Sequence, residues 1–361
     1  MGNIIPNFFG SWEPYQNVEC QNAWAGCDAS EAGAPITGGK LVNGKLTRRR
    51  GDHEVDERCV EVGGPLSSMS SCTKHPGHTD FIPVPEFGLR HLPRPYRNKL
   101  VLDFLKACAN LVVRLHLGFI SDGRPEKWPG TEDRYPFAVH RGTDLVSNVG
   151  SGWVSRVRPC WEEHGLCRCA TCREMEDEGK ERRWWEVLIV TARHVVFDSV
   201  EAKMCEVTLF DDHKDGSGSV VLMAYEMGLG HTEEDFCFVM CATHDPKVAE
   251  RLQEMMDERE TLSDMIVQQY QHVDDIPTNT VVISHPHGRM KYVSVGEFKG
   301  LEKMGDKWIY SFRHTAATCP GSSGGVVLPL IGWWRGLFRA APHNFALTSS
   351  ENLSGRWGFF F

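Results

Sequence analysis

Three short strings of the sequence contain the residue types that nucleophilic catalysis requires. His194 lies in the string TARHV, directly after the apolar run WWEVLIV, and Asp235 opens the apolar run FCFVMC. Ser323 lies in the string GSSGG, just before the apolar run VVLPL. A serine hydroxyl is a weak nucleophile at neutral pH and needs a neighbouring base, which a carboxylate in turn orients. Each string alone is common in ordinary loops, but together the strings predict acyl-transfer chemistry.

The order His194, Asp235, Ser323 along the chain is the order of the chymotrypsin-like serine peptidases. The strings themselves resemble motifs of that superfamily. TARHV resembles the TA-x-H turn around its histidine, CPGSSGG resembles the C-x-G-x-S-G-G string around its serine, and HPHG with KYVSVG resembles outer strands of its second barrel. The resemblance covers roughly residues 105 to 355, and it implies that these three residues form a catalytic triad.

The glycines around Ser323 have physical reasons to be there. Gly321 allows a turn that directs its own N–H and that of Ser323 at one point, which predicts an oxyanion hole. Ser322 does not fit G-x-S-G-G and stands where the secreted branch of the family commonly has Asp. Cys319 pairs with a downstream cysteine in those enzymes, but it is the last cysteine of this chain, so that bridge is absent.

The elements that must position these residues are predicted to be mostly strands. Short apolar segments separated by turn residues follow one another from about residue 96 to 361, which is typical of an all-β fold. The resemblance implies two six-stranded antiparallel β-barrels. Two helical patterns interrupt the strands: a short helix that runs into a strand at Leu111–Phe119, and an inserted amphipathic connector at 246–273. The nine further strand segments are SGWVSRV, WWEVLIVTARHVV, CEVTLFD, SVVLMAYEM, DFCFVMC, NTVVISHP, KYVSVGEF, KWIYSFR and SGGVVLPLIGWW.

Composition limits the classes of partner and the compartment. Residues 1–95 are rich in Gly, Pro, Ser and Asn without apolar periodicity, so we expect a flexible, largely disordered N-terminal segment. The net charge of -9 argues against nucleic acid as the main partner. No secretory signal or membrane-spanning run is recognisable. The 13 cysteines are an odd number, so we expect reduced thiols in the cytoplasm.

A cysteine-rich hairpin insertion is predicted at 160–183. It holds Cys160, Cys167, Cys169 and Cys172, with His164 among them. Four thiols within thirteen positions favour a structural zinc ion where thiols are reduced. The alternative is a cysteine-rich surface loop without metal.

The substrate side chain is expected to meet His343. The stretch around His343 resembles the GIHWGG-like strand of glutamyl endopeptidases and viral 3C-type proteases, in which a histidine contacts the substrate. The resemblance implies a preference for Glu or Gln, with Thr318 or His314 on the opposite wall. The alternative is that His343 is a surface-loop histidine after Pro342.

Taken together, the sequence favours a serine endopeptidase that acts on protein or peptide substrates and needs no cofactor for catalysis. The alternative belongs to another class, a catalytically silent barrel that serves as an interaction scaffold. An intact triad in the sequence weighs against that alternative.

Overall fold

The structure of the chain, a computed structural model, describes residues 40–42, 45–47, 53, 72–144, 146–160, 167–174, 183–270, 279–303, 310–330 and 340–357. The chain separates into the units Met1–Gly38 and Gly39–Phe361, and all described residues belong to the second. The remainder of the predicted N-terminal segment, His164 and positions 271–273 of the predicted connector lie outside the described residues. A two-stranded hairpin comes first, β1 (Lys40–Val42) paired with β2 (Lys45–Thr47).

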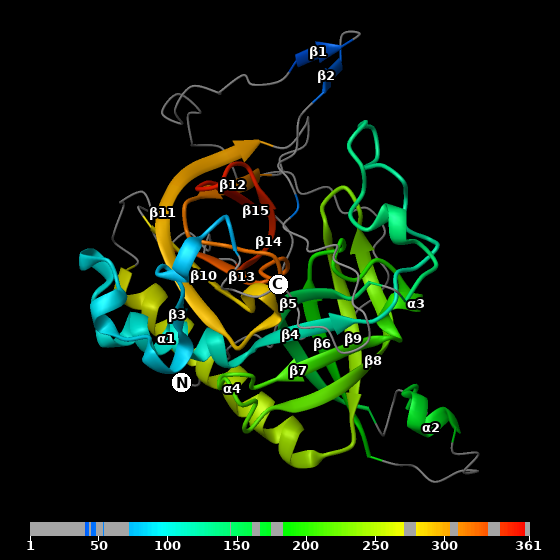
Figure 1. Cartoon of the computed structure of the whole chain (residues 1–361). Coiled ribbons are helices and arrows are strands. Elements are labelled where there is room, and N and C mark those ends of the chain that lie inside the picture. The colour runs from blue at the N-terminus through cyan, green and yellow to red at the C-terminus, as the bar shows by residue number, and fades with distance from the viewer. Residues whose placement is uncertain are drawn as a thin grey trace, which may run out of the picture. The chain divides into compact units, whose positions relative to one another are not determined.

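The first barrel is a closed sheet of six antiparallel strands (Figure 1). Around the barrel the order is β4–β5–β6–β9–β8–β7, and β4 pairs with β7 to close the sheet. The strands are β4 (Val112–Leu117), β5 (Asn148–Pro159), β6 (Trp185–Thr191), β7 (Cys205–Leu209), β8 (Val220–His231) and β9 (Phe236–Thr243).

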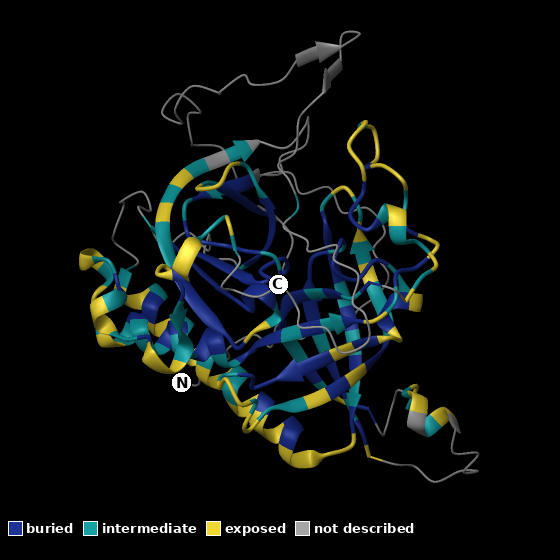
Figure 2. Ribbon diagram, viewed as in Figure 1, coloured by how far each residue is buried: buried dark blue, intermediate teal, exposed yellow. Residues whose placement is uncertain are grey.

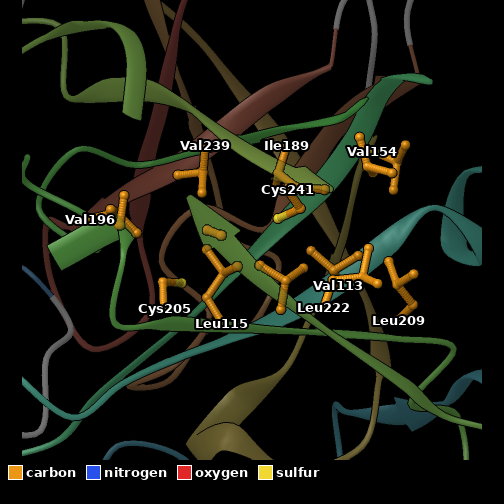
Figure 3. Close-up of a cluster of buried hydrophobic side chains, with 14 of the residues drawn as sticks. Val113, Leu115, Val154, Ile189, Val196, Cys205, Leu209, Leu222, Val239 and Cys241 are labelled. Atoms are coloured by element: carbon orange, nitrogen blue, oxygen red, sulfur yellow. The ribbon is translucent and has the colours of Figure 1, made fainter. Parts of the chain in front are cut away.

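The interior of the first barrel is filled by branched aliphatic side chains and thiols (Figure 3). Leu115 of β4, Ile189 of β6 and Val239 of β9 are completely buried there. Each such side chain stabilises the fold by about 1.5–3 kcal/mol relative to exposure. Side chains alternate between the core and the outer surface along each strand. Packing of the inward side chains fixes the strands, and the strand ends position the residues of the candidate site.

The second barrel also has six antiparallel strands. Its order is β10–β13–β14–β15–β12–β11, and pairing of β10 with β11 closes it. The strands are β10 (Asn279–Ser284), β11 (Tyr292–Lys303), β12 (Tyr310–His314), β13 (Val326–Leu330), β14 (Ala341–Ala346) and β15 (Asn352–Trp357). The predicted all-β class with two six-stranded barrels is confirmed. β14 and β15 are absent from the strands predicted by apolar patterning.

Two helices brace the barrels from outside (Figure 1). α1 (Lys99–Asn110) has Asn98 as its N-cap, and the Asn98 side chain accepts a hydrogen bond from the Val101 amide at 3.0 Å. α4 (Pro246–Tyr270) is the predicted amphipathic connector, and it packs against α1. Leu252 of α4 enters the core of the first barrel, while Ile266 joins a cluster with side chains of both barrels. Short helices complete the structure: α2 (Ala170–Glu174), α3 (Ser199–Ala202) and single 3-10 turns at 76–78, 84–86, 89–91, 94–96, 138–140 and 286–288.

The ordered chain begins earlier than the boundary at residue 96 that composition indicates. β3 (Ile82–Pro83) adds to the edge of β11, and Phe81, Phe87 and Leu92 are buried. Figure 2 shows the burial of each described residue along the ribbon. Residues 72–95 of the predicted flexible segment therefore belong to the folded unit. Their apolar anchors are single residues between prolines, and such spacing produces no periodic signal. Within the described residues, no helix combines the length and apolar surface that crossing a membrane requires.

Candidate active site

His194 and Asp235 form a buried pair at one end of the first barrel. His194 lies in the turn after β6, and its Nδ1 donates to Oδ2 of Asp235 at 2.8 Å. The backbone N–H of His194 donates to Oδ1 of the same carboxylate at 2.9 Å. Both side chains are essentially inaccessible to solvent. The two hydrogen bonds fix the imidazole plane and leave Nε2 as the nitrogen available for proton transfer.

The Asp235 carboxylate is held ionised by its surroundings. Burial by itself raises the pKa of Asp235, but the charge of His194, its hydrogen bond, and smaller contributions from His53 and Asn344 outweigh burial and lower the pKa. Nδ2 of Asn344, in β14, donates to Oδ2 and to the main-chain oxygen of Asp235, at 2.9 and 2.8 Å. Asp235 has φ of 51°, a conformation that most side chains avoid. Asn344 is thus a positioning residue from the second barrel, and sequence reasoning missed it.

A buried ion pair supports the turn that carries His194. The Arg124 guanidinium donates to the main-chain oxygens of His194 and Val195 at 2.9 and 3.3 Å. It also forms two hydrogen bonds with Glu201, at 2.6 and 2.7 Å, and neither side chain is exposed. A bidentate, fully hydrogen-bonded pair of this kind is costly to break, since removal of one partner leaves a buried charge. Arg124 therefore orients the histidine turn without contacting the triad side chains.

Ser323 lies on a tight turn between β12 and β13. Gly321 has φ of 92° and Gly324 has φ of 79°, both in the left-handed region that favours glycine. A Cβ on Gly324 would stand 2.2 Å from the main-chain oxygen of Ser151, so no larger residue fits there. The main-chain oxygen of Ser323 accepts a hydrogen bond from the Ser151 amide at 2.8 Å. The turn is therefore locked onto β5 of the first barrel.

The two serines of the turn differ in their hydrogen bonds. Oγ of Ser322 lies 3.1 Å from Oγ of Ser284 and accepts from the Cys319 amide at 3.2 Å. Among the described residues, neither Oγ of Ser323 nor Nε2 of His194 has a hydrogen-bond partner. Within the same residues the amides of Gly321 and Ser323 donate to no backbone oxygen. The Ser322 hydroxyl thus takes part in the hydrogen bonds of the turn, whereas Ser323 Oγ and His194 Nε2 are not hydrogen-bonded to each other or to any other described residue.

The three residues expected to meet the substrate side chain lie close together. Nδ1 of His343 lies 3.0 Å and Nε2 of His314 lies 2.8 Å from the Ser354 hydroxyl, and both histidines are completely buried. The Thr318 hydroxyl donates to Oδ1 of Asn352 at 2.9 Å. His343 is therefore a buried residue of β14, not a surface-loop histidine. Ser354 and Asn352 of β15 complete a polar group that the sequence did not indicate.

An N-terminal histidine packs against the triad. The His53 ring lies 4.2 Å from the His194 ring, between centroids, and is stacked on Trp128 at 4.7 Å. Its Nδ1 lies 3.1 Å from the main-chain oxygen of Asn344. Nothing in the local string RGDHEV indicates this contact, because it joins residues 141 positions apart in the sequence.

Two closed antiparallel six-stranded barrels carry the His-Asp pair on one and the serine turn on the other. The fold is chymotrypsin-like. No protein-family model matches this chain, and no curated protein matches it either.

Solved structures of peptidases are similar to the chymotrypsin-like unit at low identity. The HtrA-type protease AlgW with a tripeptide is 12% identical with a TM-score of 0.36, over 72% of this chain and 60% of that one. The Rv3671c protease from M. tuberculosis, in its active form, is 11% identical with a TM-score of 0.35, over 74% of this chain and 82% of that one. This chain thus spans 60% of the length of that AlgW chain.

The cysteine-rich insertion gathers three of its four expected ligands. Atoms of Cys167, Cys169, Cys172 and His244 that can ligate a metal all lie within 4.8 Å of one another. Nε2 of His244 lies 3.2 Å from the Cys172 thiol and 3.8 Å from the Cys169 thiol. The fourth expected ligand, Cys160, is not in this group. It is buried beside Trp184 and Tyr225, and its thiol donates to the Arg158 oxygen at 3.5 Å.

Proposed function

We propose that this chain is a serine endopeptidase that hydrolyses peptide bonds through an acyl-enzyme. One observation carries the proposal: the buried hydrogen bond between His194 and Asp235, together with Ser323 on a glycine turn that leaves its hydroxyl without a partner among the described residues. The nucleophile, the base and the oxyanion donors all come from the chain, so the reaction requires no cofactor.

In the proposed reaction, Nε2 of His194 takes the proton from Ser323 as Oγ attacks the scissile carbonyl carbon. Asp235 keeps its hydrogen bond to Nδ1 and stabilises the imidazolium that forms. The amides of Gly321 and Ser323 donate to the oxyanion of the tetrahedral intermediate. The C–N bond then breaks, and the amine leaves with the proton from His194. Water attacks the resulting ester, again with His194 as base, and restores the Ser323 hydroxyl.

A catalytically silent scaffold is the second candidate, and one contact favours it. His53 packs against the ring of His194 and lies beside Asp235, so it covers part of the pair that would act as the base. Labelling of the full chain with a fluorophosphonate separates the two functions, because the probe reacts only with an activated serine. We expect stoichiometric labelling of the peptidase. A folded chain that resists the probe would be a scaffold.

We further propose that the substrate residue on the acyl side of the cut bond is Glu or Gln. A ring N–H of His343 or of His314 can donate a hydrogen bond to the carboxylate or amide oxygen of a substrate Glu or Gln. In addition, the Lys74 ammonium donates to the Thr318 hydroxyl at 3.1 Å and to Oδ1 of Asn352 at 3.3 Å. A cation beside this polar group favours a carboxylate.

Cleavage of a peptide library tests this specificity. Glu or Gln should lead at the first acyl-side position. His343→Ala should reduce the preference by about 10- to 100-fold, the value of one hydrogen bond to a charged group. Arg158→Ala, in β5 of the first barrel, is the control and should leave the preference unchanged. A leading Arg, Lys or large aromatic residue would reject His343 as the specificity residue and leave the triad proposal intact.

We also propose that the cysteine-rich insertion binds one structural zinc ion. Three thiolates and one imidazole are a common tetrahedral zinc set and leave no position for a reactive water. None of the ten described cysteines is in a disulfide, which suits a reducing compartment such as the cytoplasm.

Metal analysis of single variants tests the ligand set of this insertion. Cys172→Ser and His244→Ala should each lose one equivalent of zinc relative to the wild-type chain. Cys160→Ser is the matched control and should lose none, because its thiol is not among the grouped ligating atoms and donates to the Arg158 oxygen instead. Loss of zinc in Cys160→Ser, with retention in His244→Ala, would restore the all-cysteine set expected from the sequence.

A further inference from the structure

A second group of metal-ligating side chains lies behind the nucleophile turn. Cys72 and His78 come from the N-terminal segment, His287 from the 3-10 turn after β10, and Cys319 from the chain four residues before Ser323. All four ligating atoms lie within 4.8 Å of one another. His78, His287 and Cys319 are buried, and Cys72 is partly buried. Three segments that are far apart in sequence therefore converge on one point.

Three of the six distances within this group are close to the edges of a tetrahedron around a single ion. The thiols of Cys72 and Cys319 are 3.6 Å apart, and the Cys319 thiol is 3.6 Å from Nε2 of His78. Nε2 of His78 and Nε2 of His287 are 3.0 Å apart. Ideal zinc bonds give edges of about 3.8 Å between two sulfurs, about 3.6 Å between sulfur and nitrogen, and about 3.3 Å between two nitrogens. A disulfide requires sulfurs at about 2.05 Å, so the two thiols are placed as ligands.

The backbone is strained where it presents these histidines. His78 has φ of 49° and His287 has φ of 56°, and only five non-glycine residues of the described chain have positive φ. A non-glycine residue in this conformation persists only where the surroundings require it. A metal ion bound by both side chains would account for this conformation in two separate loops.

The group is in direct contact with the oxyanion turn. The His287 amide donates to the Pro320 oxygen at 2.5 Å. A Cβ on Gly321 would stand 2.9 Å from that same His287 nitrogen. An ion bound here would stabilise the Gly321 turn through His287 and Cys319. It would also attach the segment 72–78 to that turn through Cys72 and His78.

We propose that Cys72, His78, His287 and Cys319 bind one zinc ion that fastens the N-terminal segment to the nucleophile turn. Two thiolates and two imidazoles in tetrahedral geometry select zinc over magnesium or calcium, which prefer oxygen ligands. The site is structural, because its four protein ligands leave no open coordination position. It does not depend on the activity of the triad. A consequence is that Lys74, between the two N-terminal ligands, stays at the Thr318 hydroxyl.

The test is metal analysis of the full chain carrying Ser323→Ala, so that self-cleavage cannot release the N-terminal segment. His78→Ala should lose one equivalent of zinc. His75→Ala is the matched control, since His75 lies in the same segment but outside the group, and it should retain the metal. Cobalt substitution should give the visible bands of a tetrahedral ion, together with thiolate charge-transfer absorption that falls in Cys72→Ser.

A measurement on folded protein covers the case in which these variants do not fold. In the Cys172→Ser chain, which lacks a ligand of the other proposed zinc site, X-ray absorption at the zinc edge should show two sulfur and two nitrogen neighbours. Equal zinc content in His78→Ala and His75→Ala would overturn the proposal. So would a zinc shell of oxygen and nitrogen alone, or a Cys72–Cys319 disulfide found by mass spectrometry in the purified chain.

Discussion

Replacing Ser323 with alanine should abolish fluorophosphonate labelling and lower peptidase kcat by about six orders of magnitude, because the members of a triad act as a unit. The variant should fold normally, since Oγ of Ser323 has no hydrogen-bond partner among the described residues. Active-site labelling followed by peptide mapping, with kcat measured on the best library peptide, provides the measurement.

Ser322→Ala is the matched control for that variant. Its hydroxyl is bonded to the Cys319 amide and lies near Ser284, so we expect a modest loss of stability with labelling retained. Probe attached to Ser322, or labelling that survives Ser323→Ala, would contradict the assignment of the nucleophile.

Asp235→Asn should lower kcat/KM by about 10⁴-fold while leaving Ser323 in place. Three donors face the Asp235 carboxylate: the His194 ring and amide, and the Asn344 side chain. An Asn side chain would turn its own NH₂ group toward at least one of them. The imidazole would then lose the acceptor that keeps the proton on Nδ1, and Nε2 could no longer act as base. Steady-state kinetics on the preferred peptide measure the effect.

Glu186→Gln is the control for this second variant. Glu186 is also a buried carboxylate with charged and hydroxyl partners, Arg158 and Tyr225, but it lies at the start of β6, the opposite end from the His194 turn. It should lose stability without a comparable loss of kcat/KM. If Asp235→Asn kept activity within about tenfold of the wild type, Asp235 would not be the orienting carboxylate of the base.

Several parts of the fold follow from local sequence patterns. Ten of the twelve barrel strands coincide with apolar segments that alternate or run continuously, because their side chains pack in barrel cores. β14 and β15 do not show this apolar pattern. Their buried positions carry polar residues, among them His343, Asn344 and Ser354. A strand that presents site residues inwards lacks the apolar alternation by which strands are recognised.

Residues 72–95 of the N-terminal segment differ from the prediction for a related reason. Composition predicts flexibility up to residue 95, yet Phe81 packs against Tyr292 of β11, and Phe87 and Leu92 join a buried cluster with α1 and side chains of both barrels. Isolated anchors separated by Pro and Gly are indistinguishable from a loop until the surface that receives them is known. The cysteine-rich insertion shows the same limit, since His244 lies 72 positions after Cys172.

Local strings of the sequence indicate His194, Asp235 and Ser323 as the residues of the proposed chemistry. A tight turn depends on residues within a few positions, such as Gly321 and Gly324 around Ser323, so its signal is present in the sequence. The surroundings of these three residues depend on the tertiary structure. Asn344 reaches Asp235 from the other barrel, and His78 and Cys319 meet across 241 positions of sequence. Closure of the two barrels brings these distant residues into contact, and no local pattern records that closure.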